Sequence, residues 1–172
     1  MTLPKRTWSW KDFINSIAWG VSLLLQALLT IQFFNSLGLT ILVYVGFALF
    51  LIFLIMGWMA RVEFRRKGGI PQGDSLIRTT VLVDSGIYSI VRHPMYASWI
   101  VLSLSLLLLS QCWVSAILCV IVALFLSLDA RKEDASLTLK FGEEYKDYMK
   151  RVPRINFLLG FLRLRTRSYK PH

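Results

Sequence analysis

The stretch LTILVYVGFALFLIFLIMGWMA, residues 39–60, contains no charged side chain. A second stretch, FINSIAWGVSLLLQALLTIQFF, covers residues 13–34 and is equally free of charge. Each is about the 20 residues that an α-helix needs to cross a hydrocarbon core of roughly 30 Å. Because a chain of 172 residues cannot build a soluble core large enough to bury such helices, the sequence predicts that both span a membrane.

A third uncharged region runs from residue 94 to residue 128 and is interrupted by Ser110, Gln111 and Cys112. It is too long for one span and predicts a hairpin of two short helices, at about 95–110 and 113–128. The shortest helices that span a membrane have about 17 residues, and these two are about that length or shorter. The sequence therefore does not decide whether they cross the bilayer completely or thin it locally. The predicted fold class is an all-α integral membrane protein, one domain over residues 1–172, with four transmembrane helices.

The charge distribution predicts the topology. Basic residues concentrate before the first predicted span, between the second and third, and after the fourth, whereas the turns at 35–38 and 110–112 carry no charge. The positive-inside rule then places both termini and the middle loop in the cytoplasm. The net charge of +10 is explained by attraction to anionic lipid headgroups, without a nucleic-acid partner. We expect a multi-pass protein of the cell membrane in a prokaryote, or of the endoplasmic reticulum in a eukaryote.

Polar residues gather in two cytoplasmic blocks, at about 72–96 and 129–157. The first contains a short β-prone run at 79–83. The second continues the fourth helix, and we expect Gly142 to divide this helix and Pro153 to end it. Together the blocks predict a loop and C-terminal helices that cap a ligand pocket. Residues at helical spacing in the second block form one apolar stripe: Leu137, Phe141, Tyr145 and Tyr148.

The motif GIYSIVRHPMY, residues 86–96, ends where the third predicted helix begins. Pro94 suits the first turn of a helix, where its missing N–H is not required. Arg92 and His93 then lie at the helix start, where free N–H groups and the helix dipole favour an anion such as a carboxylate. For either residue alone, a snorkelling arginine or an ordinary hydrogen-bonded histidine is the simpler interpretation. Their combination at the membrane surface indicates a functional site.

Glu133 and Asp134 follow the fourth predicted span at its membrane exit. Acidic groups so close to an apolar region need a partner, which a cationic ligand or a nearby arginine would supply. A metal site is not expected, because Cys112 and Cys119 lack the spacing of metal ligands and the chain has only two histidines.

These motifs resemble, in order and spacing, those of the isoprenylcysteine carboxyl methyltransferase family and its phospholipid methyltransferase relatives. The similar elements are Gly-x-Tyr-x-x-x-Arg-His-Pro-x-Tyr, Glu-Asp-x-x-Leu and the segment 141–153, so the resemblance runs from about Thr80 to Phe157. The first two predicted helices match only in hydropathy. The resemblance implies S-adenosylmethionine as cofactor and a lipidated or lipid-like methyl acceptor, both bound at the cytoplasmic mouth of the helices.

The resemblance also implies site residues. The candidate catalytic residues are Glu133 and Arg92, and the candidate substrate-binding residues are Arg131 and Asp129. The chain departs from the family at Thr80, where histidine is frequent, and at Asp129, where an arginine usually stands; Arg131 is the nearest substitute but faces another side of a helix. The implied cofactor contacts are Thr80, Val81, Leu82, Val83, Tyr88, His93, Pro94, Met95, Tyr96 and Glu133.

Methyl transfer from a sulfonium is an in-line displacement, so positioning supplies most of the acceleration. The aromatic faces of Tyr88 and Tyr96 are suited to hold a sulfonium by cation–π attraction. A carboxylate acceptor is ionised at pH 7, whereas an amine or thiol must first lose a proton. The resemblance therefore implies an isoprenylcysteine carboxyl O-methyltransferase-like enzyme, with a phospholipid or small-molecule N- or S-methyltransferase as the alternative. An NADPH-dependent membrane reductase and a non-enzymatic scaffold are the alternatives from other classes.

Overall fold

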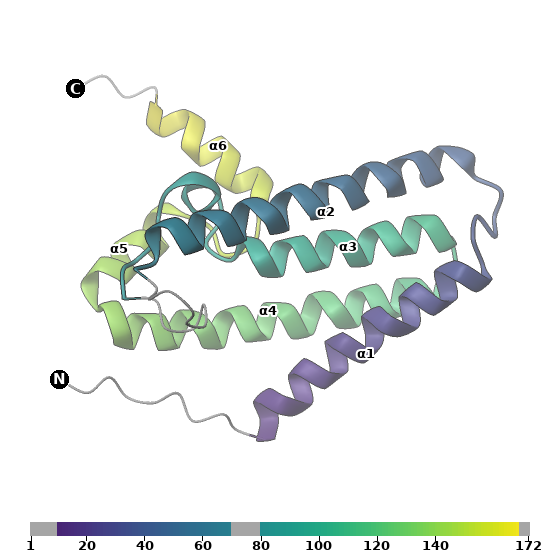
Figure 1. Cartoon of the computed structure of the whole chain (residues 1–172), viewed down its shortest axis with the longest axis horizontal. Helices are drawn as coiled ribbons and strands as arrows, with labels where there is room; N and C mark the ends of the chain where they lie inside the picture. Colours follow the sequence, from purple (N-terminus) through teal and green to yellow (C-terminus); the bar gives the residue numbers. More distant parts are fainter. Residues whose placement is uncertain (1–9, 70–79, 169–172) are drawn as a thin grey trace. The chain divides into compact units, whose positions relative to one another are not determined.

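The computed structural model describes residues 10–69 and 80–168. Over these residues it contains helices and connecting segments but no strand (Figure 1). The all-α prediction is thus confirmed for the described part. The helices are α1 (Trp10–Gln32), α2 (Thr40–Lys67), the short 3-10 helix η2 (Gly86–Ser89), α3 (Pro94–Ser110), α4 (Trp113–Phe141), α5 (Glu143–Arg151) and α6 (Phe157–Ser168).

Within residues 10–69 and 80–168, three helices are long and apolar enough to cross a membrane: α1 over Phe13–Gln32, α2 and α4. They correspond to the predicted spans at 13–34, 39–60 and 113–128. Helix α3 is apolar but has only 17 residues, so the fourth span stays a prediction. Both α2 and α4 extend beyond the predicted spans into charged sequence, because arginine, lysine and glutamate are good helix formers and no glycine intervenes before Gly68 and Gly142.

The chain divides into two compact units. The first comprises Met1–Leu54 and Ser98–Glu133, and the second comprises Ile55–Ala97 and Asp134–His172. The assignment of residues 1–172 to one domain stays a prediction.

In the first unit, the turn after α1 packs against the turn after α3. The backbone N–H of Asn35 donates to the carbonyl of Leu109 at 2.8 Å. The side-chain amide of Gln111 donates to Asn35 Oδ1 at 2.8 Å and to the Leu39 carbonyl at 3.0 Å. Asn35 and Gln111 both have positive φ, 54° and 53°, a conformation that commonly ends a helix. The predicted break at 110–112 is therefore confirmed, and both turns lie at one end of this unit.

A buried glutamine links three helices of the first unit. Gln26 on α1 is fully buried; its Oε1 accepts from the Ser103 hydroxyl of α3 at 2.6 Å. Its amide donates to the Ser115 carbonyl of α4 at 2.9 Å. Polar groups in an apolar bundle need such partners, and interhelical hydrogen bonds of this kind contribute about 0.6 to 2 kcal/mol each. The network selects one register for these helices.

In the second unit, the predicted apolar stripe forms the core. Tyr145, Tyr148 and Val152 are buried together, and the surrounding side chains include Leu137 and Phe141 from the end of α4. Gly142, with φ 60° and ψ −131°, separates α4 from α5, and α5 ends two residues before Pro153. Both helix-ending predictions are thus confirmed.

Candidate functional site

The carboxylate of Asp134 is the centre of the polar cluster in the second unit. Its Oδ1 lies 2.8 Å from His93 Nε2 and accepts from the Tyr145 hydroxyl at 2.7 Å. Its Oδ2 accepts from Arg92 Nη2 at 3.1 Å and from Arg154 Nε at 2.6 Å. Asp134, Arg92 and His93 are all buried. Because an ionised carboxylate only accepts, His93 donates to it through Nε2.

The backbone brings these side chains together. The segment before α3 runs beside the segment after α5: the N–H of Arg92 donates to the Pro153 carbonyl at 3.0 Å, and the N–H of His93 donates to the Arg154 carbonyl at 3.1 Å. Gly142 reverses the chain between α4 and α5, so that Tyr145 reaches back to the carboxylate. The cluster therefore unites three segments separated in sequence.

The cluster carries more positive than negative charge. Two guanidinium groups, those of Arg92 and Arg154, share the single carboxylate of Asp134. Among the described residues, the buried Nε of Arg92 is one of two buried side-chain polar atoms without a hydrogen-bond partner. A buried donor of this kind costs free energy unless a ligand or water accepts from it. The arrangement thus favours an anionic group, and the planar guanidinium matches a carboxylate or a phosphate.

Two tyrosines stabilise the cluster as uncharged donors. Burial raises the pKa of Tyr145, and its hydrogen bond to Asp134 raises it further. Burial likewise raises the pKa of Tyr148, whose hydroxyl donates to the carbonyl of Tyr88 at 2.6 Å. Both phenols therefore stay protonated at neutral pH and keep α5 bonded to Asp134 and to η2.

Two pairs of aromatic rings lie along the segment that carries Arg92 and His93. The rings of His93 and Tyr96 lie 5.7 Å apart between centroids, and so do the rings of Phe64 and Tyr88. The Tyr88 hydroxyl donates to the carbonyl of Ala60 at 3.4 Å, which joins η2 to α2. The segment 88–96 thus has an aromatic pair at each end, Tyr88 with Phe64 and Tyr96 with His93.

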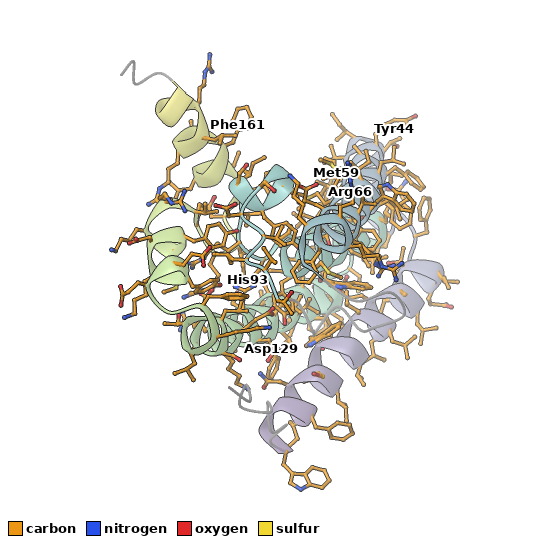
Figure 2. The ribbon with its side chains drawn as sticks, turned by 60° about the vertical axis from the view of Figure 1, so that its left-hand side comes forward. Tyr44, Met59, Arg66, His93, Asp129 and Phe161 are labelled. Atoms are coloured by element: carbon orange, nitrogen blue, oxygen red, sulfur yellow. The ribbon has the colours of Figure 1, made fainter. Side chains whose placement is uncertain are left out.

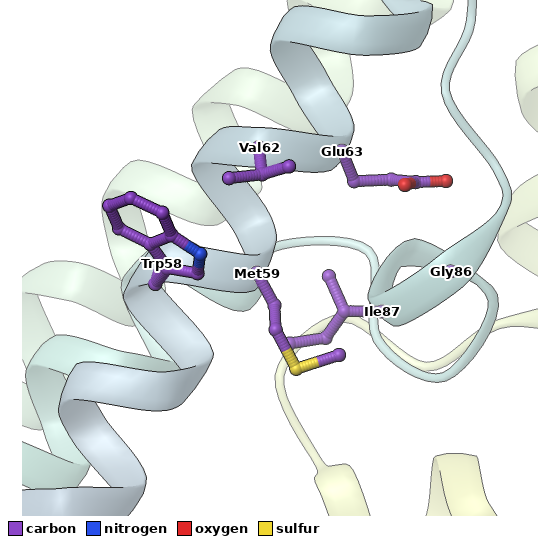
Figure 3. Close-up of a pocket in the computed structure, with 6 residues that line it drawn as sticks. All are labelled: Trp58, Met59, Val62, Glu63, Gly86 and Ile87. Carbon is purple, nitrogen blue, oxygen red and sulfur yellow. The ribbon is translucent and has the colours of Figure 1, made fainter.

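A pocket of about 160 Å³ lies between α2 and η2 (Figure 3). Glu63 is the one charged residue of its lining, and its Oε1 accepts from Ser85 at 2.9 Å and pairs with Lys67 at 2.8 Å. Gly86 has φ 59°, and a Cβ there would contact the Glu63 carboxylate at 2.9 Å. The pocket is mainly apolar and is lined by Trp58, Met59, Val62, Glu63, Gly86 and Ile87.

Most of the predicted cofactor residues belong to the second unit. Val83, Tyr88, His93 and Pro94 are buried there, and Met95 and Tyr96 are half-buried. Residues 72–79 of the predicted site segment lie outside the described residues.

The β-prone run at 79–83 is not a strand over Thr80–Val83, and Thr79 lies outside the described residues. Thr80 and Val81 are exposed, and both N–H groups donate to the Gly68 carbonyl at the end of α2. Leu82 packs on the Tyr145 cluster. The run is bonded to a helix end and has no neighbouring strand among the described residues, which a ladder requires.

The other predicted site residues belong to the first unit: Glu133, Arg131 and Asp129. Asp129 Oδ1 accepts from the Asn15 amide at 2.8 Å, which links α4 to α1. Arg131 is exposed and Glu133 is half-buried. The catalytic and substrate-binding roles given to these three residues stay predictions.

Asp134, Tyr145 and Arg154 were not among the predicted site residues. For Asp134 the sequence did contain a signal, because it lies three positions before Leu137 and continues the apolar stripe backward. Glu133 lies four positions before Leu137 and continues it as well, so the spacing did not separate the two residues. A charged residue in register with a buried face needs a buried partner. Arg154 had no comparable signal, because its contact depends on the backbone pairing of 92–93 with 153–154.

The segment around these residues is similar to known proteins. The isoprenylcysteine carboxyl methyltransferase family matches residues 75–139. Protein-S-isoprenylcysteine O-methyltransferase of Mus musculus is 38% identical over 76 residues, which are 44% of this chain and 27% of the relative. The Homo sapiens protein of the same name is 41% identical over 78 residues, 44% of this chain and 27% of the relative.

The protein of that name from Schizosaccharomyces pombe is 38% identical over 74 residues, 42% of this chain and 31% of the relative. The chain thus covers less than a third of the length of each of these curated relatives. No solved structure gives a significant match. The match to the isoprenylcysteine carboxyl methyltransferase family over residues 75–139 includes Arg92, His93 and Asp134, and it agrees with the resemblance that the motifs indicated.

Proposed function

We propose that this chain is a membrane-embedded methyltransferase that uses S-adenosylmethionine and transfers the methyl group to the carboxylate of a lipid-like acceptor. The observation that carries the proposal is the cationic cluster around Asp134, in which Arg92 is buried with an unpartnered Nε. Its sequence lies in the part of the chain that matches a family of carboxyl methyltransferases.

The residues present fit two of the charged groups of this cofactor, its carboxylate and its sulfonium. Its carboxylate suits the excess guanidinium charge of Arg92 and Arg154. Its sulfonium suits an aromatic face, which Tyr96 and Tyr88 offer near the same segment. Bound there, S-adenosylmethionine would supply the methyl group. Asp134 already accepts from four donors, so we assign it to holding the arginines and His93 in place rather than to pairing with the sulfonium.

The same cluster favours a carboxylate acceptor over an amine or a thiol. A carboxylate is a nucleophile at neutral pH without a base. In this cluster the one carboxylate is engaged by four hydrogen bonds, so it is poorly suited to remove a proton. Burial of the cluster excludes competing water. We also propose that Glu133 contacts the cofactor, as the resemblance implies.

We assign the apolar pocket beside η2 to the hydrocarbon chain of the acceptor. Met59, Val62 and Ile87 give it an apolar lining, and Ile87 directly precedes Tyr88 in the chain. A prenyl or acyl chain seated there gains about 0.8 kcal/mol per buried CH₂. An acceptor without the chain is therefore expected to react with a much higher KM.

The decisive experiment uses the purified chain in detergent with methyl-tritiated S-adenosylmethionine and an S-farnesylcysteine analogue. We expect a labelled product that releases methanol in alkali, as a methyl ester does. Alkali-stable label would indicate N- or S-methylation and exclude the carboxylate acceptor. Calorimetry with S-adenosylmethionine and NADPH separates the classes, because binding of NADPH alone would indicate a reductase and binding of neither a scaffold.

The same calorimetry tests the residues. We expect His93→Ala and Glu133→Gln each to weaken cofactor binding at least tenfold, while Glu143→Gln, an exposed pair with Lys146, leaves it unchanged. Unchanged affinity in either of the first two variants removes that residue from the site.

A further inference from the structure

Helix α6 packs against the rest of the second unit along one side only. Gly160 is buried, and a Cβ at this position would collide with the carbonyl oxygen of Ile90. Phe157 and Leu164 are half-buried and lie on the same side of the helix, three residues before and four residues after Gly160. The docked side is therefore a stripe centred on a glycine that permits close approach.

A different side of α6 is apolar and exposed. Leu158 is 81% exposed, Phe161 55% and Leu162 61%, and the spacing of i, i+3 and i+4 puts them on one face. Figure 2 shows Phe161 projecting from the ribbon of α6. Three large apolar side chains on one turn and a half of helix form a continuous surface, which needs a partner of matching character.

The charge around this face selects the partner. Arg163 and Arg165 follow the apolar residues and are exposed. From residue 148 to the end of the sequence given there is no aspartate or glutamate, whereas residues 163–172 contain three arginines and a lysine. A matching partner must combine an apolar interior with a negatively charged surface, as an anionic lipid leaflet does.

The docking position agrees with a membrane surface. Ile90, on which Gly160 packs, lies four residues before Pro94, where the apolar helix α3 begins. Helix α6 is thus attached to the chain directly before an apolar helix. With α3 entering the bilayer as the sequence predicts, α6 lies where headgroups meet the hydrocarbon.

We propose that α6 is an interfacial helix that binds the anionic leaflet of the bilayer, with Leu158, Phe161 and Leu162 inserted among the acyl chains and Arg163 and Arg165 at the phosphates. This binding is independent of the proposed reaction. It orients the segment 90–93, and with it the cluster at Asp134, toward the membrane surface.

The test uses the full chain with Cys112→Ser and Cys119→Ser, reconstituted in nanodiscs of phosphatidylcholine with 40% phosphatidylglycerol. An environment-sensitive fluorophore is attached through Leu158→Cys or, as the matched control, through Glu144→Cys on the exposed side of α5. Lipids with a nitroxide near the headgroup are expected to quench the first probe at least threefold more than the second. Arg163→Gln with Arg165→Gln should at least halve this difference, and so should nanodiscs without phosphatidylglycerol.

Equal quenching of the two probes overturns the proposal. So does a probe at position 158 that is shielded from water but not quenched by lipid, because a second protein surface then covers the face. Folding of each variant is checked by gel filtration and circular dichroism. If Leu158→Cys does not fold, the same quenching is measured with the fluorophore attached through Leu162→Cys, which lies on the same face of α6.

Discussion

At the scale of single residues, Asp134 organises the second unit. It receives hydrogen bonds from α5, from the segment before α3 and from the segment after α5, and all of these donors except Arg154 are buried. Removing one partner from a buried charged network leaves the other charges buried without an opposite charge. The resulting loss of folding free energy is much larger than the net stabilisation that the intact ion pair contributed. The carboxylate is therefore expected to matter for both folding and binding.

Asp134→Asn is expected to lower the free energy of unfolding by about 3 kcal/mol, because two arginines then lie beside an amide that cannot neutralise them. Denaturation in detergent, followed by circular dichroism, measures the change. Glu143→Gln is the control, because its pair with Lys146 is exposed and contributes little. An Asn variant as stable as the control would contradict the central role given to Asp134.

Tyr145 predicts a pH dependence. Burial raises its pKa in the folded protein above the value of about 10 in an unfolded chain. The folded state then binds the phenolic proton more tightly, so this stabilisation is complete below about pH 10 and is lost as the pH rises further. Tyr145→Phe should cost about 1.5 kcal/mol at neutral pH, because a hydrogen bond to a charged group is lost.

Above pH 10, Tyr145→Phe should lose stability with a shallower slope than the unaltered chain. Denaturation at pH 7, 9, 10 and 11 tests both statements. Tyr148 also has a raised pKa, so a smaller slope is expected to persist. An identical slope in the two proteins would show that Tyr145 does not titrate with unfolding.

At the scale of elements, local signals predicted most of the helices and their ends. The uncharged runs became α1, α2 and α4, Pro94 begins α3, and Gly142 separates α4 from α5. The β-prone run failed because its backbone bonds to the end of α2. The helix η2 had no local signal, since its place depends on Tyr148 and Ala60, which are distant in sequence.

Gly142→Ala tests the junction between α4 and α5. A Cβ at this position meets no atom within 4 Å, so the cost comes only from backbone strain at φ 60° and ψ −131°. We expect a loss of about 1 to 3 kcal/mol in the free energy of unfolding, together with weaker cofactor binding, because Tyr145 is displaced from Asp134. The matched control is Gly20→Ala, in the interior of α1 and also without a neighbour within 4 Å, which should be neutral or stabilising. Equal effects of the two substitutions would contradict a strained junction.

At the scale of the whole molecule, the sequence predicted which segments carry the site but not the contacts that form it. Hydropathy and charge indicated membrane helices and cytoplasmic blocks, because both are properties of neighbouring residues. The pairing of residues 92–93 with 153–154 depends on a chain reversal some 60 residues long, and no local pattern encodes it. This explains why His93 was predicted and Arg154 was not.

The predicted membrane topology concerns the turns after α1 and α3 and the helix α5. The turns after α1 and α3 contact each other and lack charge, whereas basic residues follow α2 and α4. The positive-inside rule then puts the uncharged turns on the outer side and α5 on the cytoplasmic side. With Cys112→Ser and Cys119→Ser as background, Leu37→Cys should react with a membrane-impermeant maleimide in intact cells, whereas Glu144→Cys should react only after permeabilisation. Both sites are exposed, so accessibility within the protein does not limit either reaction. Labelling of Glu144→Cys but not of Leu37→Cys in intact cells would mean the opposite orientation. Labelling of both variants or of neither before permeabilisation would mean that the two positions lie on the same side, as they would if α3 did not cross.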